Sequence, residues 1–394
     1  MFQFVVKMVN LLRKVEEILI LPKEPNVLHL SSEKSWRGGE QQIAYLIEEL
    51  NELGITNQVA CRRNSAFAVY CQKRAWPHVT LPFANGVDFY TALAIKKICQ
   101  QQRIDLVHVH SAKSHSLAVL SATLGNPTPL VLSRRVDFPI RQNRSTQWKY
   151  NHSSIKKIVC VSEAIERIVR EGVRVPEKCT TVYSGIDIHR FHPPTGYLRQ
   201  RFHLADSTPL IVNTSAIADH KDYFTFVDTA QAFQSLGIDA RFVIIGDGPE
   251  REAIRQYIEQ RGLEETVLMT GFINNLEEVL PEADVFLMTS KTEGLGTSVL
   301  DAFACRVPVV ATRAGGIPEM VIHQETGLLA EVGDAVALAQ NLEEVIKNTT
   351  LKKQLLENAY QHLLQHFTKK KMAVSTLTVY ENVITSLKRN SKNT

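Results

Sequence analysis

The chain has 394 residues, of which 44% are hydrophobic and 22% charged, a composition typical of a soluble globular protein and long enough for two domains. Its six cysteines are scattered without a C-x-x-C pair, which argues against a zinc site or a disulfide framework and suits a reducing cytoplasm. The net charge of +4 is unevenly distributed along the chain. Residues 1–200 carry 27 Lys and Arg against 16 Asp and Glu, so we expect the first half to meet an anionic partner.

Residues 1–21 are rich in apolar side chains at helical spacing, but Lys7, Arg13 and Glu16 interrupt them. No uncharged run approaches the ~20 residues of a membrane span, and the apolar core and cleavage site of a signal peptide are missing. We therefore expect residues 1–25 to form an amphipathic N-terminal extension. It would lie on a membrane surface, dock on its own domain, or be a translated leader ahead of the true start.

From residue 26 onward, short apolar runs alternate with helical patterns. The first run, at 27–30, precedes a glycine-containing turn and a helix predicted over 40–53. Further runs lie at 59–60, 79–81, 106–109, 130–132 and 158–161. Strands that alternate with helices in this way predict a parallel sheet covered on both faces, as in a Rossmann-like domain.

The alternation pauses near residue 185, and Pro193-Pro194-Thr195-Gly196 gives a boundary signal. A second series follows, with a helix predicted over 223–236 and strands at 210–212, 241–245, 267–269, 285–288 and 307–310. We therefore predict an α/β protein of two Rossmann-like domains, residues 26–195 and 196–365, facing each other across a cleft. A helix and tail follow over 366–394. Ligands of such sheets bind at the carboxyl ends of the strands.

The most informative turn runs from Lys291 to Asp301 and connects the run at 285–288 to a predicted helix. Gly294 and Gly296 let backbone N–H groups approach a ligand, and the start of the helix adds the positive end of its dipole, a combination that suits phosphate. Glu293 and Asp301 are carboxylates, which accept hydrogen bonds from hydroxyl groups instead. Phosphate and polyol recognition in one turn indicates a nucleotide sugar.

Other turns that follow predicted strands are weaker signals when each is taken alone. They contain Gly38 with Gly39, Lys221, Gly246 with Gly248, Gly271 with Phe272, and Gly315 with Gly316. The glycine pair at 38–39 fits a tight turn equally well, Lys221 fits a solvated loop lysine, and residues 271–273 fit an ordinary loop. The turn at Gly246 lacks the third glycine of the dinucleotide fingerprint, because Arg251 stands there, which disfavours an NAD site.

Six motifs occur in a fixed order along the chain. They are Gly-Gly-Glu at 38–40, Ser-Gly-Ile-Asp at 184–187, Gly-Asp-Gly-Pro at 246–249, Gly-Phe at 271–272, Glu-Gly-Leu-Gly at 293–296 with an acid eight residues after the glutamate, and Ala-Gly-Gly-Ile-Pro-Glu at 314–319. This set resembles the retaining glycosyltransferases of family 4, which have the GT-B fold. The resemblance runs from about residue 26 to residue 329.

The resemblance implies roles for particular residues. Residues 26–195 would bind the acceptor and 196–365 the nucleotide sugar, and the C-terminal helix would cross back to the first domain. Glu293 would hold hydroxyls of the donor sugar, Asp301 those of the ribose, and Lys221 would neutralise the leaving diphosphate. The donor-binding residues implied are Gly38, Gly39, Gly246, Gly271, Phe272, Gly294, Leu295, Gly296, Thr297 and Asp301.

The chain departs from the family pattern in ways that bear on the mechanism. Members commonly carry an arginine five or six residues before the lysine, where Ser215 and Ala216 stand here. The family often has a histidine where this chain has Arg135. Because an arginine cannot act as a base, Arg135 is expected to hold an anion. His110, at the end of the run at 106–109, is the candidate to replace that histidine, although a histidine at the end of a strand is commonly structural.

The sequence also indicates what the reaction needs and lacks. No D-x-D motif occurs, so we expect no metal and no cofactor, with Lys221 and backbone amides taking the role of a cation. The donor is expected to be a nucleoside-diphosphate sugar, with UDP favoured over GDP. Together with the resemblance, this predicts a retaining glycosyltransferase acting on a glycan or lipid-linked acceptor in polysaccharide or lipopolysaccharide synthesis.

The acceptor side is indicated by a basic segment. Residues 134–157 contain seven Lys and Arg against one acid, with Phe138, Trp148 and Tyr150 interleaved. This fits a face for an anionic lipid or lipid-linked glycan at the cytoplasmic membrane surface, or equally a solvated charged face, and the first alternative predicts a cytoplasmic protein peripheral to the inner face of the membrane. Nucleic acid is disfavoured, because the aromatics fit no RNA-binding consensus. The alternative functions are a catalytically silent nucleotide-sugar-binding subunit, or another GT-B enzyme such as an epimerase or a phosphorylase.

Overall fold

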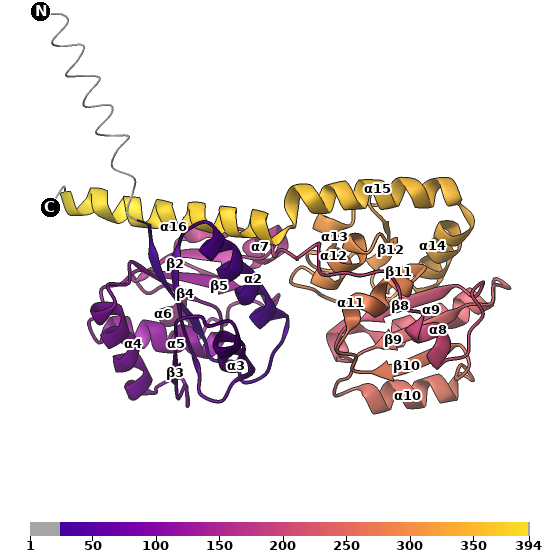
Figure 1. Ribbon diagram of the computed structural model, residues 1–394, viewed down its shortest axis with the longest axis horizontal. Coiled ribbons are helices and arrows are strands. Elements are labelled where there is room, and N and C mark those ends of the chain that lie inside the picture. Colours follow the sequence, from indigo (N-terminus) through magenta and orange to yellow (C-terminus); the bar gives the residue numbers. More distant parts are fainter. Residues whose placement is uncertain (1–23, 393–394) are drawn as a thin grey trace, which may run out of the picture. The chain divides into compact units, whose positions relative to one another are not determined.

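A computed structural model describes residues 24–392, so the predicted amphipathic N-terminal helix lies outside the described residues, apart from the last positions of that extension. Two parallel sheets are present (Figure 1), a seven-stranded one in the order β3-β2-β1-β4-β5-β6-β7 and a six-stranded one in the order β10-β9-β8-β11-β12-β13. The strands of the first sheet are β1 (Asn26–Ser31), β2 (Thr56–Arg62), β3 (His78–Leu81), β4 (Leu106–Val109), β5 (Leu130–Arg134), β6 (Ile155–Cys160) and β7 (Cys179–Thr181). Those of the second are β8 (Leu210–Thr214), β9 (Arg241–Ile245), β10 (Val267–Gly271), β11 (Val285–Met288), β12 (Val309–Thr312) and β13 (Leu328–Ala330). The prediction of two Rossmann-like sheets is confirmed.

Helices separate most of these strands. Those before β8 are α2 (Gly38–Glu52), α3 (Ala66–Lys73), α4 (Phe89–Gln101), α5 (Ala112–Thr123), α6 (Arg144–Tyr150), α7 (Glu163–Gly172), the 3-10 turn η1 (Pro176–Lys178) and α8 (Tyr197–Arg201). Those after β8 are η2 (Asp219–Lys221), α9 (Tyr223–Gln234), α10 (Arg251–Gln260), α11 (Leu276–Val279), η3 (Leu280–Glu282), α12 (Thr297–Ala304), α13 (Ile317–Met320), α14 (Ala335–Lys347), α15 (Thr349–His366) and α16 (Lys369–Lys392).

Several helices begin at a side chain that caps the first turn. The side chains of Asp88, Ser162 and Asp222 each accept a hydrogen bond from a backbone N–H three residues further on, in α4, α7 and α9. Such a cap satisfies one of the N–H groups that the first turn leaves unpaired and contributes roughly 1 kcal/mol to helix stability. Local sequence therefore fixes where these helices start. It thereby also fixes the length of the loop between each helix and the strand before it.

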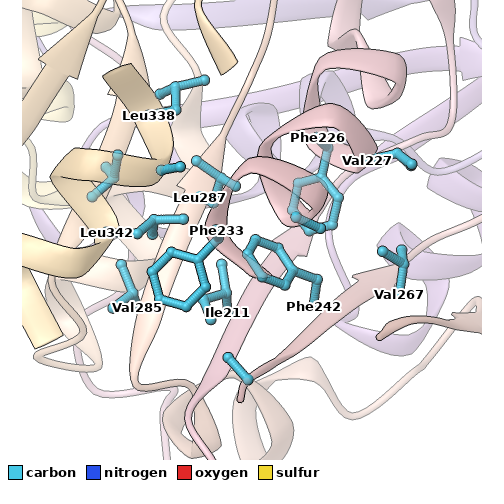
Figure 2. Packing of buried hydrophobic residues seen from close by; sticks show 14 of the residues in the cluster. Ile211, Phe226, Val227, Phe233, Phe242, Val267, Val285, Leu287, Leu338 and Leu342 are labelled. Carbon is cyan, nitrogen blue, oxygen red and sulfur yellow. The ribbon is translucent and has the colours of Figure 1, made fainter. Parts of the chain in front are cut away.

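The second sheet is held by a large apolar core. Phe226 and Phe233 on α9 pack against Phe242 on β9, with ring centroids 5.6 and 5.8 Å apart, and Leu338 and Leu342 of α14 belong to the same cluster (Figure 2). All five side chains are at most 1% exposed. Because burial of one such side chain contributes about 1.5–3 kcal/mol, this core anchors the strands whose ends carry the site.

The described chain divides into two compact units. Residues 24–36, 47–131 and 377–392 form the first, and Arg37–Leu46 with Leu132–Thr376 form the second. In the first unit, the hydroxyl of Tyr380 on α16 lies 2.5 Å from Nδ1 of His108 on β4. The prediction that the C-terminal helix returns to the sheet formed early in the chain is therefore confirmed. None of the helices within residues 24–392 is both long enough and apolar enough to span a bilayer.

The structure refines several predicted boundaries. Gly38 and Gly39 were predicted in a turn before α2 but are its first two residues. Gly271 was predicted in the loop after a strand at 267–269 but is the last residue of β10. The sequence analysis missed β13 and α14, and it also missed β7, which is only three residues long. The predicted domain limits at residues 195 and 365 stay predictions. Consistent with the first of them, no strand is present between Thr181 and Leu210 in the described chain.

Candidate active site

A cavity of about 390 Å³ in the second unit brings most of the predicted site residues together. The predicted residues that line it are Gly38, Gly39, Arg135, Lys221, Glu293, Gly294, Leu295, Gly296, Thr297 and Asp301. They come from the start of α2, the end of β5, the loop after β8 and the turn between β11 and α12. Residues that are more than 250 positions apart in the sequence therefore share one pocket, as the motif order predicts.

Lys221 and Glu293 form a buried ion pair in this pocket. Lys221 Nζ donates to Glu293 Oε1, and Ser290 Oγ donates to the same oxygen at 2.8 Å. The side chains are 15% and 9% exposed, so solvent screens this pair little. The pair joins the loop after β8 to the turn after β11 and places a cation beside a hydroxyl-accepting carboxylate.

Two glycines allow the turn at Glu293 to pack against other backbone segments. A Cβ at Gly294 would lie 2.3 Å from the carbonyl oxygen of Arg135, and one at Gly315 would lie 2.0 Å from that of Glu293. Gly315 also has φ +52°, which other residues adopt only with strain. Gly316 N–H donates to the Glu293 carbonyl at 3.1 Å. The Ala-Gly-Gly-Ile-Pro-Glu motif therefore braces the predicted catalytic glutamate.

The start of α12 faces the pocket. Gly296, at φ +91°, precedes the helix, and Thr297 and Ser298 are its first residues and line the cavity. The first N–H groups of a helix have no acceptor within it, and the helix dipole places positive potential at the same end. This is the geometry that binds a phosphate.

Asp301 lies one turn further along α12 and is buried at the wall of the same cavity. Its Oδ1 has no hydrogen-bond partner among the described residues. Burial raises the pKa of this carboxyl to about 6, while the nearby charge of Arg190 partly offsets the rise. A buried acceptor without a partner is costly unless a ligand supplies a donor, so Asp301 suits a ligand hydroxyl.

Arg135 follows β5 and lines the cavity with its guanidinium buried. Its Nε has no partner among the described residues. Burial lowers the pKa of Arg135 to about 10, which leaves it charged at neutral pH, and the carboxylate of Glu40 opposes the shift. A buried cation with an unpaired N–H at the wall of the pocket fits the predicted role of holding an anion.

Three residues predicted to bind the donor do not line the cavity. Gly246 packs so closely on the loop after β8 that a Cβ would lie 1.9 Å from the carbonyl oxygen of Ser215, and its N–H donates to the Gly271 carbonyl at 3.0 Å. Phe272 is 74% exposed. Gly246 thus supports Ser215, which does line the cavity. The contacts of Gly246, Gly271 and Phe272 with the donor stay predictions.

His110, the predicted substitute base, lies in the first unit in a buried group with His29 and His108. Its Nε2 lies 3.0 Å from His29 Nδ1, and His29 Nε2 lies 2.9 Å from Asn57 Oδ1. Burial lowers the pKa of His29 to about 4. The ligand atoms of the three rings lie within 4.8 Å of one another, so they are the group within residues 24–392 that could hold a metal ion. A catalytic role of His110 stays a prediction.

Glu319 lies in α13 but acts on a different helix. Its carboxylate lies at the start of α7, where it accepts the N–H groups of Glu163 and Ala164 at 2.8 Å each. The N-cap of α7, Ser162, donates to the carbonyl of Gly294 at 2.5 Å. The motif that ends in Glu319 therefore connects the turn of the site to α7.

Sequence reasoning missed several residues of the site. Gln42, Ser184, Thr214, Ser215, Ala216 and Ser298 all line the cavity. Thr214, Ser215 and Ala216 lie at the end of β8, where only a position after a strand could have indicated them, whereas Ser184 belongs to the motif at 184–187, which was given no donor contact. Arg190 was also missed. Its guanidinium donates to Tyr45 Oη at 3.1 Å, and its charge acts on Asp301.

Comparisons with known proteins agree with this architecture. The family of group 1 glycosyl transferases matches residues 197–362, and glycosyltransferase family 4 matches residues 36–190. A Bacillus anthracis N-acetyl-alpha-D-glucosaminyl L-malate synthase is 27% identical over 308 residues, covering 75% of this chain and 80% of its own. An Escherichia coli UDP-Gal:alpha-D-GlcNAc-diphosphoundecaprenol alpha-1,3-galactosyltransferase is 23% identical, covering 67% and 72%.

Solved structures give the same fold. A glycosyltransferase from Rickettsia africae superposes with a TM-score of 0.81 at 19% identity, covering 92% of this chain and 99% of its own. Anabaena HepE in complex with UDP superposes with a TM-score of 0.78 at 20% identity, covering 91% and 100%. These likenesses show that the two parallel sheets form a GT-B fold. The group 1 and family 4 matches on adjacent stretches of the chain indicate a glycosyltransferase of the family 4 type with this fold.

The raised pKa of Asp301 predicts a pH dependence of stability. The folded protein retains this proton up to about pH 6, whereas the unfolded chain releases it near the ordinary value of 3.8, so raising the pH through this window removes stability. We expect the unfolding free energy of Asp301→Asn, relative to the unmodified protein, to increase by roughly 2 kcal/mol between pH 4 and pH 7. Denaturant unfolding at both pH values measures it. The same difference for exposed Asp206→Asn should stay flat, and a flat profile for Asp301→Asn would contradict the assignment.

Proposed function

We propose that this glycosyltransferase transfers a sugar from a nucleoside-diphosphate sugar, with UDP favoured over GDP, to a glycan or lipid-linked acceptor, with retention of the anomeric configuration and without a metal. The observation that carries the proposal is the cavity in which the Lys221–Glu293 pair, the open start of α12 and the partnerless carboxylate of Asp301 meet. It offers a cation and amides to phosphate and carboxylates to hydroxyls.

Each part of the donor has a matching group. The diphosphate lies against the N–H groups of Thr297 and Ser298, with Lys221 as its counter-charge. The ribose hydroxyls donate to Asp301, whose proton is lost before pH 7, and the hydroxyls of the sugar donate to Glu293. Support for a uridine nucleotide comes from the structural neighbour HepE, which was solved with UDP.

The chemistry needs little acid–base catalysis. The bond between the anomeric carbon and the diphosphate oxygen breaks through an oxocarbenium-like transition state, while negative charge grows on the leaving diphosphate. Lys221 and the helix start stabilise that charge in a pocket screened from water. As Glu293 accepts the sugar hydroxyls, its hold on Lys221 weakens, so the cation becomes available to the phosphate at the moment of transfer.

The acceptor is a glycan or a lipid-linked glycan of cell-envelope or polysaccharide synthesis. A relative named as a galactosyltransferase of a diphosphoundecaprenol-linked sugar supports this, whereas the relative named as an L-malate synthase has a small carboxylate acceptor. Arg135, a buried cation at the wall of the cavity, serves an anionic group of either kind. A catalytically silent nucleotide-sugar-binding subunit is the alternative, because Ser215 and Ala216 stand where the family commonly has an arginine.

A thermal-shift screen against UDP, GDP, ADP and their sugars tests the donor. A ligand that binds only the folded protein raises the melting temperature, and we expect UDP and a UDP-sugar to give the largest rise, unaffected by a chelator. Slow hydrolysis of that sugar, with the α-anomer as the first product by NMR, confirms an active retaining enzyme. Binding without any hydrolysis supports the silent subunit, and no shift with any nucleotide contradicts the proposal.

Lys221 is expected to act on the transition state. Lys221→Ala removes the counter-charge of the leaving diphosphate, and kcat for donor hydrolysis should fall roughly a hundredfold or more. Lys291→Ala is the matched control, because Lys291 lies in the next loop and pairs with Asp219 outside the cavity. Equal rates for the Lys221 variant and the unmodified protein, with unchanged melting temperature, would remove Lys221 from the mechanism.

Glu293 is expected to act on the sugar more than on the nucleotide. Glu293→Gln keeps the shape of the side chain but breaks the ion pair and weakens acceptance from sugar hydroxyls, so donor hydrolysis should fall far more than affinity for UDP. Calorimetric titration with UDP and the hydrolysis rate measure the two effects separately. If the affinity for UDP falls as much as the rate does, Glu293 serves the nucleotide and its proposed role is wrong.

A further inference from the structure

A second basic and aromatic region lies in the second unit, away from the residues that line the cavity. It consists of the loop 136–143, α6, residues 151–156 and residues 172–178, which we call the α6 surface. These segments are in contact: Gln147 on α6 donates to the Gly172 carbonyl at 3.0 Å, and Asn151 Oδ1 accepts the N–H of Arg174 at 2.7 Å. The α6 surface is therefore one continuous patch built from two stretches of chain, residues 136–156 and 172–178.

Large apolar side chains protrude from the α6 surface. Phe138 is 60% exposed, Trp148 48%, Val175 44% and Val136 38%. Phe138 is held in place by Arg134, which donates to its backbone carbonyl and stacks over its ring with the guanidinium carbon 4.9 Å from the centroid. A soluble protein gains nothing by fixing such side chains in water, so their exposure marks an interaction site.

Cations surround these side chains. Burial and the charges of Lys178 and Lys156 lower the pKa of His152, and burial and Lys156 lower that of Lys178, which shows how closely the positive groups are packed. Arg144 and Arg174 are exposed, and no described ion pair involves either of them. The α6 surface holds six Lys and Arg against two carboxylates, Asp137 and Glu177, and this excess of positive charge favours an anionic partner.

The same surface contains a cavity of about 410 Å³ lined by Arg144, Trp148, His152, Arg174 and three side-chain amides. Two of the amides, those of Gln147 and Asn151, are bonded to each other at 2.9 Å. Gln142 Nε2 donates to the Ile140 carbonyl at 3.4 Å, and His152 Nδ1 lies 2.7 Å from Ser154 Oγ. The groups offered to a ligand are therefore the two guanidinium groups and the indole. Guanidinium groups bind phosphate oxygens with paired hydrogen bonds, and an indole lies at the boundary between apolar and wet regions.

We propose that the α6 surface docks the protein on a bilayer that contains anionic phospholipid, with one headgroup phosphate in this cavity and Phe138 and Trp148 inserted at headgroup level. A bilayer is favoured over nucleic acid because exposed Val136 and Val175 suit acyl chains and cannot stack on bases. Docking is independent of the donor chemistry proposed above, because it uses none of the residues of the donor cavity and is measured without nucleotide.

A competing surface lies on α4 in the first unit, where Val87, Phe89, Tyr90 and Leu93 are 51–68% exposed. Apolar exposure is greater there, but the segment 87–93 holds Asp88 and no cation, and α4 adds only Lys96 and Lys97 further along, against six Lys and Arg on the α6 surface. Charge complementarity to an anionic membrane therefore favours the α6 surface, and the α4 side chains supply a matched control.

Co-sedimentation of the full-length protein with vesicles tests the proposal. We expect binding to phosphatidylcholine vesicles containing phosphatidylglycerol, weakened by salt, and little binding to phosphatidylcholine alone. The double variant Arg144→Gln/Arg174→Gln should bind roughly thirtyfold more weakly, since each Lys or Arg at an anionic surface is worth about 1 kcal/mol. Lys73→Gln/Lys353→Gln removes the same charge from exposed positions elsewhere and should bind normally.

The aromatic side chains are tested in the same way. Phe138→Ala/Trp148→Ala should reduce vesicle binding, whereas Phe89→Ala/Tyr90→Ala should not, and unchanged melting temperatures show that both variants fold. Equal binding to neutral vesicles, equal loss with the control variants, or loss only with the α4 variant would each overturn the proposal. Saturable binding of glycerol phosphate or of an oligonucleotide, without any binding to vesicles, would also overturn the proposal.

Discussion

The candidate site depends on the buried ion pair between Lys221 and Glu293. Each partner follows one of two neighbouring strands of the second sheet, β8 and β11, so the pair adds a charged link between loops that the bond from Lys291 N–H to the His220 carbonyl, at 2.8 Å, also joins. A buried charge that loses its partner costs several kcal/mol, which makes the pair a strong constraint on both loops. Any ligand that enters must therefore offer each charge a replacement partner. A sugar diphosphate does so, with hydroxyls for the carboxylate and phosphate for the ammonium.

Around this pair, glycines act mainly by letting backbone segments touch. Gly294 lies against the Arg135 carbonyl, Gly315 against that of Glu293, and Gly246 against that of Ser215. Any side chain at these positions would push two loops apart and widen the cavity. The glycine-rich motifs of this chain are thus largely devices for packing loops at the strand ends. The glycines before α12 and at the start of α2, in contrast, line the cavity itself.

Much of the fold and part of the site could be predicted from the sequence. Alternating apolar runs predicted most strands. The family resemblance gave Glu293, Asp301 and Lys221 roles in one site, and the structure places all three in one cavity. Short or weakly apolar elements such as β7 and β13 escaped, because three residues carry too little periodicity. The placement of Gly246 was not predictable either. A glycine that packs against a backbone carbonyl and a glycine that lies against a phosphate occur in the same kind of turn between a strand and a helix. The contact of Glu319 with α7 depends on tertiary packing that no local signal encodes.

The position of Glu319 has a consequence for where an anion can settle. Two helices begin near the turn at Gly294: α12, which follows it, and α7, whose cap donates to its carbonyl. The protein's own carboxylate already occupies the amides of α7. At this turn the start of α12 is therefore open to an anion whereas that of α7 is closed by the protein's own carboxylate, so occlusion as well as attraction decides which of these two helix starts can bind one.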